Sequence, residues 1–451
     1  MKPSPETAPV AASGSASRRD FAKTSAAVVV GAAAAASVAF PSVTFGVPND
    51  KKLKVGLIGC GGRGTGAAAQ ALKADDNVEL WAMGDIDQKK IVTQMRALAQ
   101  GDRAAAAKFS GDLTNRLFVG LDAFEKVMDS GVDVVLLTTP PGFRPQHFRA
   151  AVERGLHCFV EKPCASDVAG VKNFLETAKM AKDQGVSVLG GLCYRYSDNG
   201  RELYAKIHEG AIGQIQSIHA TYFANTVKPM APEADRPAGM SDIEWQVRNW
   251  YNFTWLSGDG FVEQAVHSVD KIMWAMKDEL PVCAYGIGGR QRHNYEGNTY
   301  DHFGVTYEFA NNIRCHVTWN QYGAGPFKEN KDFIYGTEGQ AELNGTQSAT
   351  ITGKNPWNWR KPRTPRNMYQ TEHDEFFASI RKGERHADED WVARTTLLAI
   401  MGRMATYTGK RITWEDVNNS PEKLVPDDIK WDGSHKPNPM PIPGEPDTQW
   451  A

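Results

Sequence analysis

The sequence has almost no net charge and few cysteines. Its 51 Lys and Arg residues nearly balance its 53 Asp and Glu residues, which leaves a formal net charge of −2. This balance gives no electrostatic basis for binding nucleic acid or an anionic membrane surface, so neither is an expected partner. The six cysteines are scattered, form no C-x-x-C pair and stand at no zinc-binding spacing from a histidine. We therefore expect most of them to be buried free thiols.

What the sequence does have is length and apolar content. With 451 residues the chain is too long for one small domain and favours two. Hydrophobic residues make up 41% of it, and 12 Trp, 13 Tyr and 19 Phe indicate a globular core. There is no internal repeat, and beyond residue 50 no apolar run is long enough to suggest a membrane span.

Residues 1–50 are typical of an export signal and linker rather than of a folded domain. Ser17–Lys23 (S-R-R-D-F-A-K) matches the twin-arginine pattern S-R-R-x-F-x-K, and a mildly apolar stretch follows from Ala26 to Phe40. Ser37-Val38-Ala39 is the expected cleavage site, and an uncleaved signal anchor is the alternative. Because the twin-arginine route exports folded proteins, we expect a periplasmic or otherwise extracytoplasmic protein that holds any cofactor tightly.

The stretch from Leu53 to Gly64 (L-K-V-G-L-I-G-C-G-G-R-G) organises the rest of the chain. Its apolar half predicts a buried parallel strand, and its second half has G-x-G-x-x-G spacing. The first glycine permits a tight turn, the second lets a pyrophosphate approach the backbone, and the third lets helix and strand pack closely. The Ala-rich helix expected next directs free N–H groups at the phosphates. The loop residues predicted to bind a dinucleotide are Gly59, Gly61, Gly62, Arg63 and Gly64.

An acidic residue stands where the adenosine ribose of a dinucleotide would lie. Val78–Met83 predicts the second strand, and Asp85 and Asp87 follow directly after it. A carboxylate at this place binds the ribose hydroxyls of NAD, so we expect Asp85 to contact the cofactor. The two acids together repel the 2′-phosphate of NADP and favour NAD. Arg63 can offset that repulsion, so NADP stays open as the alternative.

Alternating strands and helices continue to about residue 193 and predict one doubly wound parallel sheet over residues 51–193. Thr139 and Pro140 follow one of its strands and are expected to line the ligand crevice at the carboxyl end of the sheet. The later strands expected in this domain are Val132–Leu137, His157–Val160 and Val186–Leu189, and the helices between them are Gln146–Glu153 and Val168–Gln184.

The second half of the sequence, residues 194–416, predicts an α+β domain with an open, mostly antiparallel sheet. One face of such a sheet is free to pair with a second copy, so we expect a homodimer or homotetramer. Residues 417–451 are rich in proline and polar residues and predict an extended tail. The expected strands are Ile215–Phe223, Val282–Gly289, Phe303–Phe309, Ile313–Asn320 and Lys331–Gly336, and the main helices are Gly200–Glu209, Phe261–Met276, Tyr369–Arg381 and Trp391–Thr408.

Two short motifs carry groups suited to moving a hydroxyl proton. Lys162 lies in Glu161-Lys162-Pro163, directly after a predicted strand, where its charge can stabilise an alkoxide. From this tripeptide alone, a surface lysine beside an exposed turn is the stronger alternative. Glu263 and His267 are four residues apart and share one face of a predicted helix. A histidine suits the role of general base, although a packed structural histidine is an equal alternative from this motif alone. A metal site lacks a third ligand nearby, so we expect no metal.

Taken together, the motifs resemble the Gfo/Idh/MocA oxidoreductases, the family of glucose–fructose oxidoreductase and inositol dehydrogenase. The glycine loop, Glu161-Lys162-Pro163, Gly191-x-x-x-Arg195-Tyr196 and the segment from Glu263 to Asp270 occur in the family's order across about Lys52 to Trp414. The resemblance implies an N-terminal Rossmann domain, a C-terminal domain with an open sheet, and bound NAD or NADP.

The resemblance also implies roles for individual residues. Lys162 takes the place of the family's E-K-P lysine, and His267 takes that of its acid/base histidine. Glu263 stands where the family has aspartate, and the run Ser257–Gly260 also departs from its pattern, so the substrate pocket is expected to differ. We therefore predict catalytic roles for Lys162, Glu263 and His267, cofactor contacts for Glu161 and Lys162, and substrate contacts for Tyr194, Arg195, Trp250 and Asp270.

The resulting prediction is an NAD(P)-dependent oxidoreductase that moves a hydride between nicotinamide and a carbinol carbon of a sugar, sugar derivative or polyol. One alternative is an NAD-dependent glycosidase or lyase of the same fold, in which the cofactor is reduced and re-oxidised within each cycle. A periplasmic sugar-binding protein without activity is a further alternative, and the presence of Lys162 and His267 argues against it.

Overall fold

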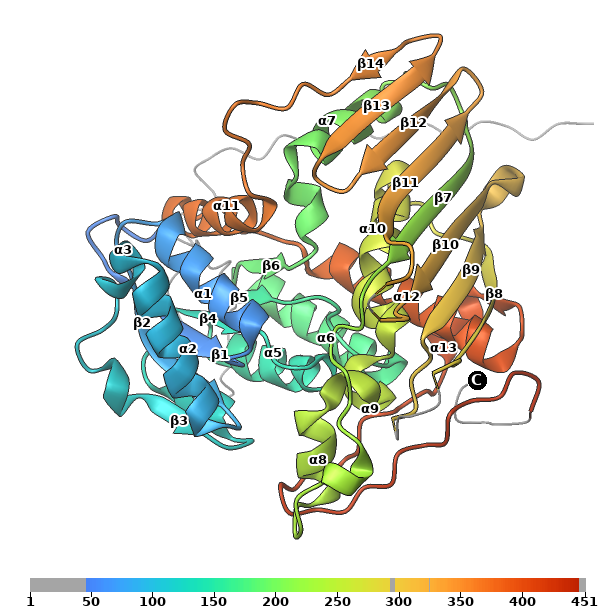
Figure 1. Cartoon of the computed structure of the whole chain (residues 1–451). Coiled ribbons are helices and arrows are strands. Elements are labelled where there is room, and N and C mark those ends of the chain that lie inside the picture. The colour runs from blue at the N-terminus through green and yellow to red at the C-terminus, as the bar shows by residue number, and fades with distance from the viewer. Residues whose placement is uncertain (1–45, 293–296, 324, 446–451) are drawn as a thin grey trace, which may run out of the picture. The chain divides into compact units, whose positions relative to one another are not determined.

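A computed structural model of the chain describes residues 46–292, 297–323 and 325–445. The twin-arginine segment lies outside the described residues. Two sheets dominate the part that is described (Figure 1). No helix of the described residues is both long enough and apolar enough to cross a membrane.

The first sheet has six strands in the order β3-β2-β1-β4-β5-β6, and every pair is parallel. The chain order reverses between β1 and β4, which is where open α/β sheets bind ligands, outside the carboxyl ends of the strands. The sequence prediction of a doubly wound parallel sheet is therefore confirmed. The strands are β1 (Leu53–Ile58), β2 (Val78–Asp85), β3 (Leu117–Val119), β4 (Val134–Leu137), β5 (His157–Val160) and β6 (Val188–Gly190).

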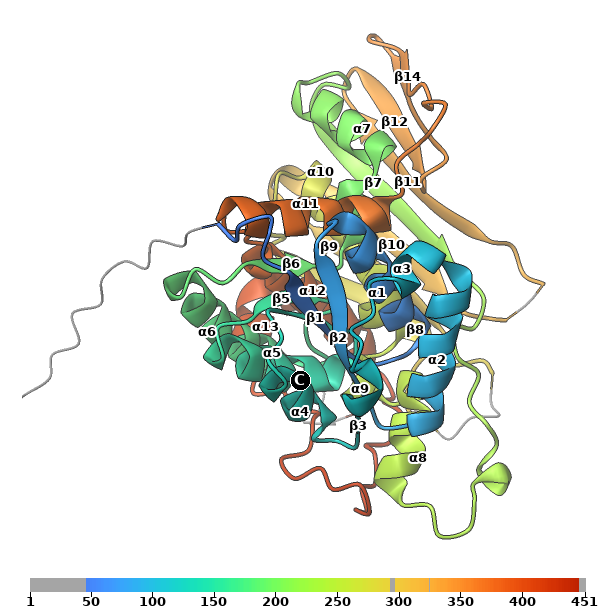
Figure 2. The same ribbon diagram turned by 90° about the vertical axis from the view of Figure 1, so that its left-hand side faces the viewer.

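Helices cover both faces of this sheet (Figure 2). On one face, alanines of α1 and a phenylalanine pair of α11 pack on Val55 and Leu57 of β1. On the other face, α4, α5 and α6 bury Phe124, Phe148 and Phe174 against the strands. The helices are α1 (Gly62–Ala74), α2 (Gln88–Gly101), α3 (Arg103–Ala106), α4 (Ala123–Asp129), α5 (Arg144–Glu153), α6 (Val168–Asp183) and, from the C-terminal half, α11 (Met368–Lys382).

The second sheet has nine strands in the order β14-β13-β12-β11-β7-β10-β9-β8-β15. Among its described strands only β7 and β10 run parallel, so the predicted mostly antiparallel sheet is confirmed. The strands are β7 (Ile215–Phe223), β8 (Cys283–Gly289), β9 (His302–Glu308), β10 (Arg314–Asn320), β11 (Glu329–Gly336), β12 (Gly339–Asn344), β13 (Ser348–Gly353), β14 (Trp357–Asn358) and β15 (Ile412–Thr413).

One face of the second sheet packs on α7 (Asp198–His208), α10 (Val266–Ala275) and α12 (Glu389–Thr408). Buried and half-buried side chains alternate along β9 and β10, as expected for a sheet with one covered face. The opposite face is open, and Ile287 on β8 is 80% exposed there. The short helices α8 (Asp242–Arg248), α9 (Thr254–Ser257) and α13 (Trp414–Asn419) complete the fold.

Several local features differ from the sequence-based expectations. The strands β12 to β14 extend the second sheet beyond the predicted set, and β3 and α4 lie where no element was expected. The helix predicted over 261–276 begins with a π-helical turn, Phe261–Ala265, before α10. The tail is extended but anchored, because the buried Glu422 pairs with the buried Arg403. All six cysteines are buried and free.

Candidate active site

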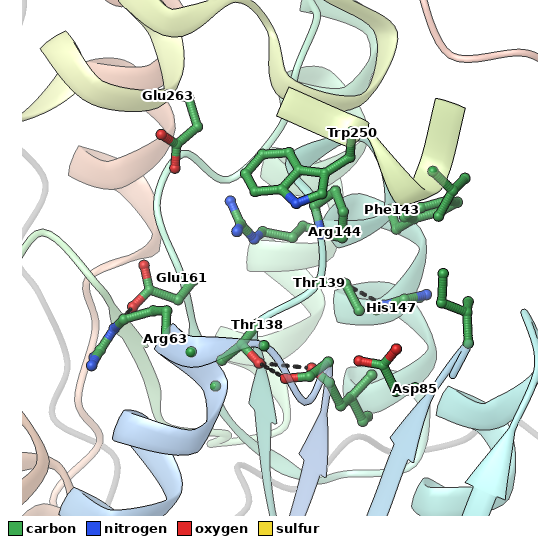
Figure 3. Close-up of a pocket in the computed structure, with 18 of the residues that line it drawn as sticks. Arg63, Asp85, Thr138, Thr139, Phe143, Arg144, His147, Glu161, Trp250 and Glu263 are labelled. Carbon is green, nitrogen blue, oxygen red and sulfur yellow. Dashed lines mark hydrogen bonds and ion pairs between the residues drawn. The ribbon is translucent and has the colours of Figure 1, made fainter. Parts of the chain in front are cut away.

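A cavity of about 820 Å³ opens at the carboxyl ends of β1, β2, β4 and β5 (Figure 3). Its floor is the glycine loop and the ends of these strands, as expected for the switch point of the sheet. Its other wall comes from residues of the C-terminal half, including Trp250, Glu263 and His267. The pocket therefore combines the predicted nucleotide site with the predicted catalytic groups.

The glycine loop has the geometry of a phosphate cradle. Gly59 has φ +95°, in the left-handed region that favours glycine, and a Cβ there would lie 2.8 Å from backbone atoms that follow β4. A Cβ on Gly64 would lie 2.0 Å from the Gly59 carbonyl oxygen, so helix α1 meets the loop directly. At Gly61 and Gly62 a Cβ would meet no protein atom within 4 Å. The open space at these two positions, beside the first N–H groups of α1, fits a dinucleotide pyrophosphate.

Asp85 lies at the end of β2 and faces this loop. One of its carboxylate oxygens accepts a hydrogen bond from the Cys60 amide at 2.7 Å, and Lys90 lies 3.8 Å from the same oxygen. Asp87 instead caps helix α2 by accepting hydrogen bonds from the amides of its first turn. Asp85 thus borders the pocket as expected of a ribose-binding acid, while Asp87 is already engaged.

A segment of the C-terminal half closes the adenosine side of the pocket. Arg248 at the end of α8 forms an ion pair with Asp87 at 3.0 Å. The Lys228 ammonium donates to the Arg248 carbonyl, and burial lowers the pKa of Lys228 to about 8. Lys228, Arg248 and Trp250 all line the cavity. Sequence reasoning did not single out Lys228 or assign a role to Arg248, because only the fold brings this segment to the nucleotide loop.

Lys162 and Glu263 form the centre of the catalytic end. The Lys162 ammonium donates to the Glu263 carboxylate at 2.8 Å and to the Glu263 carbonyl at 2.6 Å. The second carboxylate oxygen of Glu263 accepts from Gln264 at 2.7 Å. Both side chains are about nine-tenths buried yet border the cavity, so their charges act in a poorly solvated space where they are strong.

His267 lines the same end of the cavity, one helical turn after Glu263. Burial, followed by the positive charges of Lys162, Lys271 and Arg63, lowers the pKa of His267 well below its usual value. Its Nδ1 is buried and has no hydrogen-bond partner among the described residues, and the ring of Tyr194 meets it edge-on with centroids 5.2 Å apart. A neutral imidazole of this kind can accept a proton from a hydroxyl group.

Glu161 is held by the cation of the glycine loop. Arg63 forms ion pairs with Glu161 and, at 3.0 Å, with the fully buried Glu372 of α11. Burial on its own would raise the pKa of Glu161, but the charges of Arg63, Lys162 and Arg144 lower it below its usual value. Glu161 is therefore an ionised wall of the pocket, and Arg63 is already occupied by two carboxylates.

Not every predicted site residue lines the cavity. Thr139, Pro140 and Trp250 do, but Tyr194, Arg195 and Asp270 are not among its lining residues. Arg195 donates to Asp270 at 3.0 Å and also pairs with Asp278, so both charges are satisfied away from the pocket. The substrate-binding roles of Tyr194, Arg195 and Asp270 stay predictions, and this geometry does not support them. Among the described residues no group of three or more His, Cys, Asp or Glu side chains is placed to hold a metal ion.

Three lining residues that follow β4 were not singled out by sequence reasoning. Phe143, Arg144 and His147 come directly after Thr139 and Pro140, in the turn and first residues of α5. His147 contacts the Thr139 hydroxyl at 3.1 Å, and burial lowers the pKa of His147 to about 3. The signal that could have found these residues is their place after a strand that ends at the switch point.

Comparison with known proteins matches both parts of this architecture. Residues 53–189 match the profile described as oxidoreductase family, NAD-binding Rossmann fold, and residues 201–342 match the GFO/IDH/MocA C-terminal domain. Inositol 2-dehydrogenase 4 from Saccharopolyspora erythraea is 28% identical over 174 residues, which is 39% of this chain and 46% of the relative. A glycosyl hydrolase family 109 protein from Shewanella is 25% identical over 197 residues, or 43% and 40% of the two chains. The matched segment thus spans about half or less of these relatives.

Among solved structures, the fold is similar to that of aldose-aldose oxidoreductase from Caulobacter crescentus complexed with glycerol. The two share 16% sequence identity, the match covers 80% of this chain and 100% of the other, and the TM-score is 0.64. Identity this low shows a shared fold and carries no statement on substrate.

Proposed function

Because the chain belongs to the GFO/IDH/MocA oxidoreductase family, we propose that it is an NAD-dependent oxidoreductase of a sugar, sugar derivative or polyol. The observation that carries the proposal is the convergence of Lys162, Glu263 and His267 on the cavity that also holds the glycine loop. Groups that can move a hydroxyl proton thus face the nicotinamide end of a nucleotide site.

The described residues fit a dinucleotide. The glycine loop leaves open space at Gly61 and Gly62, the N-terminus of α1 offers unpaired N–H groups, and Asp85 borders the space for a ribose. When bound, NAD supplies the hydride acceptor for the alcohol carbon. The ion pair between Arg248 and Asp87 ties the C-terminal half over the adenosine end, which supports the proposal that the nucleotide is held tightly.

The residues at the catalytic end have complementary tasks. His267 is neutral, because burial lowers its pKa, and its task is to accept the hydroxyl proton as the alcohol is oxidised. The lowered pKa makes it a weaker base than an exposed histidine, so this transfer depends on stabilisation of the alkoxide at the same time. The Lys162 ammonium stabilises the developing negative charge on the same oxygen. Glu263 holds the ammonium in place and retains one bond to Gln264, so it positions Lys162 rather than competing for the proton.

The proposal is tested on holoprotein with a panel of sugars and polyols. Reduction of the bound nucleotide by at least one compound, lost in a His267→Phe variant that still binds the nucleotide, is the expected result. No reduction by any compound would refute the proposed activity. The matched variant His302→Phe replaces a half-exposed histidine of β9 that pairs with Asp301, and it is expected to react like the parent protein.

A second candidate is hydrolysis or elimination with an internal redox cycle. It is favoured by the family 109 glycosyl hydrolases among the relatives, which match 197 to 212 residues of this chain, compared with 174 to 265 residues for the inositol dehydrogenases. Such a cycle would need no external NAD. Release of sugar from a glycoside without lasting nucleotide reduction would replace the first proposal with this one.

We further propose that the protein is exported in the folded state by the twin-arginine route. Support comes from the motif Ser17–Lys23 and from the tight nucleotide site, because a cofactor inserted before export must be retained afterwards. Replacing Arg18 and Arg19 by lysine should leave the protein, with its nucleotide, in the cytoplasmic fraction. Periplasmic recovery of that variant would contradict the proposal.

We also propose that the open face of the second sheet joins two copies. Ile287 is 80% exposed and Tyr285 is 37% exposed on the same side of β8, which is unusual for an unpartnered surface. An Ile287→Lys variant is expected to have a lower molar mass in solution than the parent protein, as measured by light scattering. Ile442→Lys, at an exposed position of the tail, is the control. An unchanged mass for Ile287→Lys would argue against this face as the interface.

A further inference from the structure

Arg144 is a buried cation in the wall of the active-site pocket. It is the first residue of α5, is only 4% exposed, and lines the cavity. Its guanidinium donates one hydrogen bond, at 2.5 Å, to the carbonyl of Pro163 in the E-K-P segment. Its Nε is buried without a partner, and no carboxylate among the described residues forms an ion pair with it. Most of its donors are therefore unused.

Comparison with other arginines of the described residues shows how unusual this is. Arg403, which is fully buried, pairs with Glu422, and the partly buried Arg195 pairs with Asp270 at 3.0 Å. A buried charge is normally paired, because taking an unpaired ion out of water is costly. Arg144 also stands at the start of a helix, where the helix dipole disfavours a cation. Burial lowers the pKa of Arg144 to about 10, although Glu161 and Glu263 act in the opposite direction. The fold thus keeps a buried guanidinium at the site that forms no direct ion pair with a carboxylate of the described residues.

The direction of the side chain points to what would compensate the charge. In Figure 3 the guanidinium lies beneath the indole of Trp250 and is aimed at the space between Glu161 and Glu263. Both carboxylates are already engaged, Glu161 by Arg63 and Glu263 by Lys162. An anion entering this space would therefore meet one cation with free donors, next to the lysine assigned to the reacting oxygen.

We propose that Arg144 binds a carboxylate of the substrate, so that the alcohol which is oxidised belongs to a sugar acid or similar hydroxy acid. This inference rests on the proposed function and narrows its substrate class. The planar guanidinium fork matches a carboxylate in geometry and in charge. A single arginine without an ion pair balances a monoanion, whereas a phosphate dianion is usually bound by several donors. Of the neighbouring cations, Arg63 is paired with two carboxylates and Lys162 is assigned to the reacting oxygen.

The first test needs no variant. Binding to the holoprotein is measured by calorimetry, and reduction of the bound nucleotide by absorbance, for D-glucuronate, D-galacturonate and D-gluconate. Each acid is compared with a neutral counterpart, namely D-glucuronamide, D-galactose and D-glucitol, and D-glucose 6-phosphate is included. We expect at least one acid to bind about 10- to 100-fold more tightly than its neutral counterpart, the range for a hydrogen bond to a charged group. Equal or tighter binding of the neutral compounds, or tighter binding of the phosphate, would overturn the inference.

The second test uses variants of helix α5. Arg144→Met should remove the preference for acids, and Arg144→Lys should restore only part of it, since an ammonium keeps the charge but not the fork. Arg149→Met is the matched control, because Arg149 lies on the same helix, is exposed, and pairs with Glu153. If Arg144→Met weakens acids and neutral compounds equally, or only lowers the nucleotide content, Arg144 does not bind a substrate carboxylate.

These outcomes separate the inference from the proposed function. Nucleotide reduction by neutral sugars or polyols, with no preference for acids, leaves the oxidoreductase proposal standing and refutes the role of Arg144. Absence of nucleotide reduction by any compound refutes the oxidoreductase proposal itself. The comparison of acid with amide on the parent protein keeps the inference falsifiable even if Arg144→Met fails to fold.

Discussion

Replacing Lys162 by methionine removes the cation that pairs with Glu263 at the centre of the catalytic end. The ammonium makes two hydrogen bonds, at 2.6 and 2.8 Å, and its side chain is 11% exposed. Removing one partner of a buried ion pair costs about 3–5 kcal/mol, because the other charge is left uncompensated. Glu263 keeps its bond to Gln264, so we expect the lower end of that range for the loss in free energy of unfolding.

The same substitution should also slow the chemical step. Loss of one donor that stabilises a developing oxyanion costs about 100- to 1,000-fold in turnover. The double variant Lys162→Met/Glu263→Gln removes both charges, so it should recover most of the stability and none of the rate. Lys179→Met, an exposed lysine of α6, is the control.

The assay is single-turnover reduction of the bound nucleotide by the most reactive compound of the panel, together with urea unfolding of each variant. In the double variant we expect the free energy of unfolding to recover while the rate of nucleotide reduction stays low. The role of Lys162 would be refuted if Lys162→Met, folded and loaded with nucleotide, retained turnover within about tenfold of the parent protein, since that is far less than the loss of an oxyanion donor implies.

Three further predictions concern the nucleotide site and the buried histidine. Gly64→Ala should lower the free energy of unfolding by at least ~2 kcal/mol, because its Cβ would lie 2.0 Å from a backbone oxygen. A Cβ at position 61 would have no protein atom within 4 Å, so Gly61→Ala should keep the thermal midpoint of unfolding and should instead reduce the amount of bound nucleotide. Arg248→Gln removes a half-exposed ion pair with Asp87 worth about 1 kcal/mol, so the nucleotide should dissociate up to about fivefold faster at low salt and less so at high salt. His147 has a folded pKa of about 3, below its unfolded value, so the unfolded state binds more protons and stability falls as pH drops below about 6.5. In urea unfolding, the free energy of unfolding should fall by about 2 kcal/mol at pH 5 because of this residue, and His147→Phe should lack that part of the fall. An equal pH dependence of stability in both proteins would contradict this prediction.

Much of the fold follows from local sequence signals. The apolar runs of β5 and β7 begin and end at the residues predicted for them, because buried parallel strands and alternating strands carry strong patterns. The strands β12 to β14 were missed for a physical reason. They are short and polar on one side, so their stability depends on pairing with neighbouring strands, β12 on β11, β13 on β12 and β14 on β13, rather than on their own pattern.

The candidate site also contains parts that local sequence motifs predict and parts that only the folded structure brings together. The glycine loop and the E-K-P lysine are continuous motifs, and the sequence predicts their place at the sheet edge. The contact between Lys162 and Glu263 joins residues 101 positions apart, and it forms only because the fold places the π-helical turn before α10 at the pocket. The free charge of Arg144 is harder still to predict, since it depends on which carboxylates are already paired.

The most direct measurement is on protein purified without added cofactor. The protein is denatured, and the released nucleotide is identified by mass and by its redox state, before and after incubation with the panel of sugars, polyols and sugar acids. We predict stoichiometric NAD that is left reduced by at least one compound. Release of no nucleotide would contradict the nucleotide site from the glycine loop onward, and a nucleotide whose redox state never changes while a glycosidic bond is cut would contradict the oxidoreductase proposal.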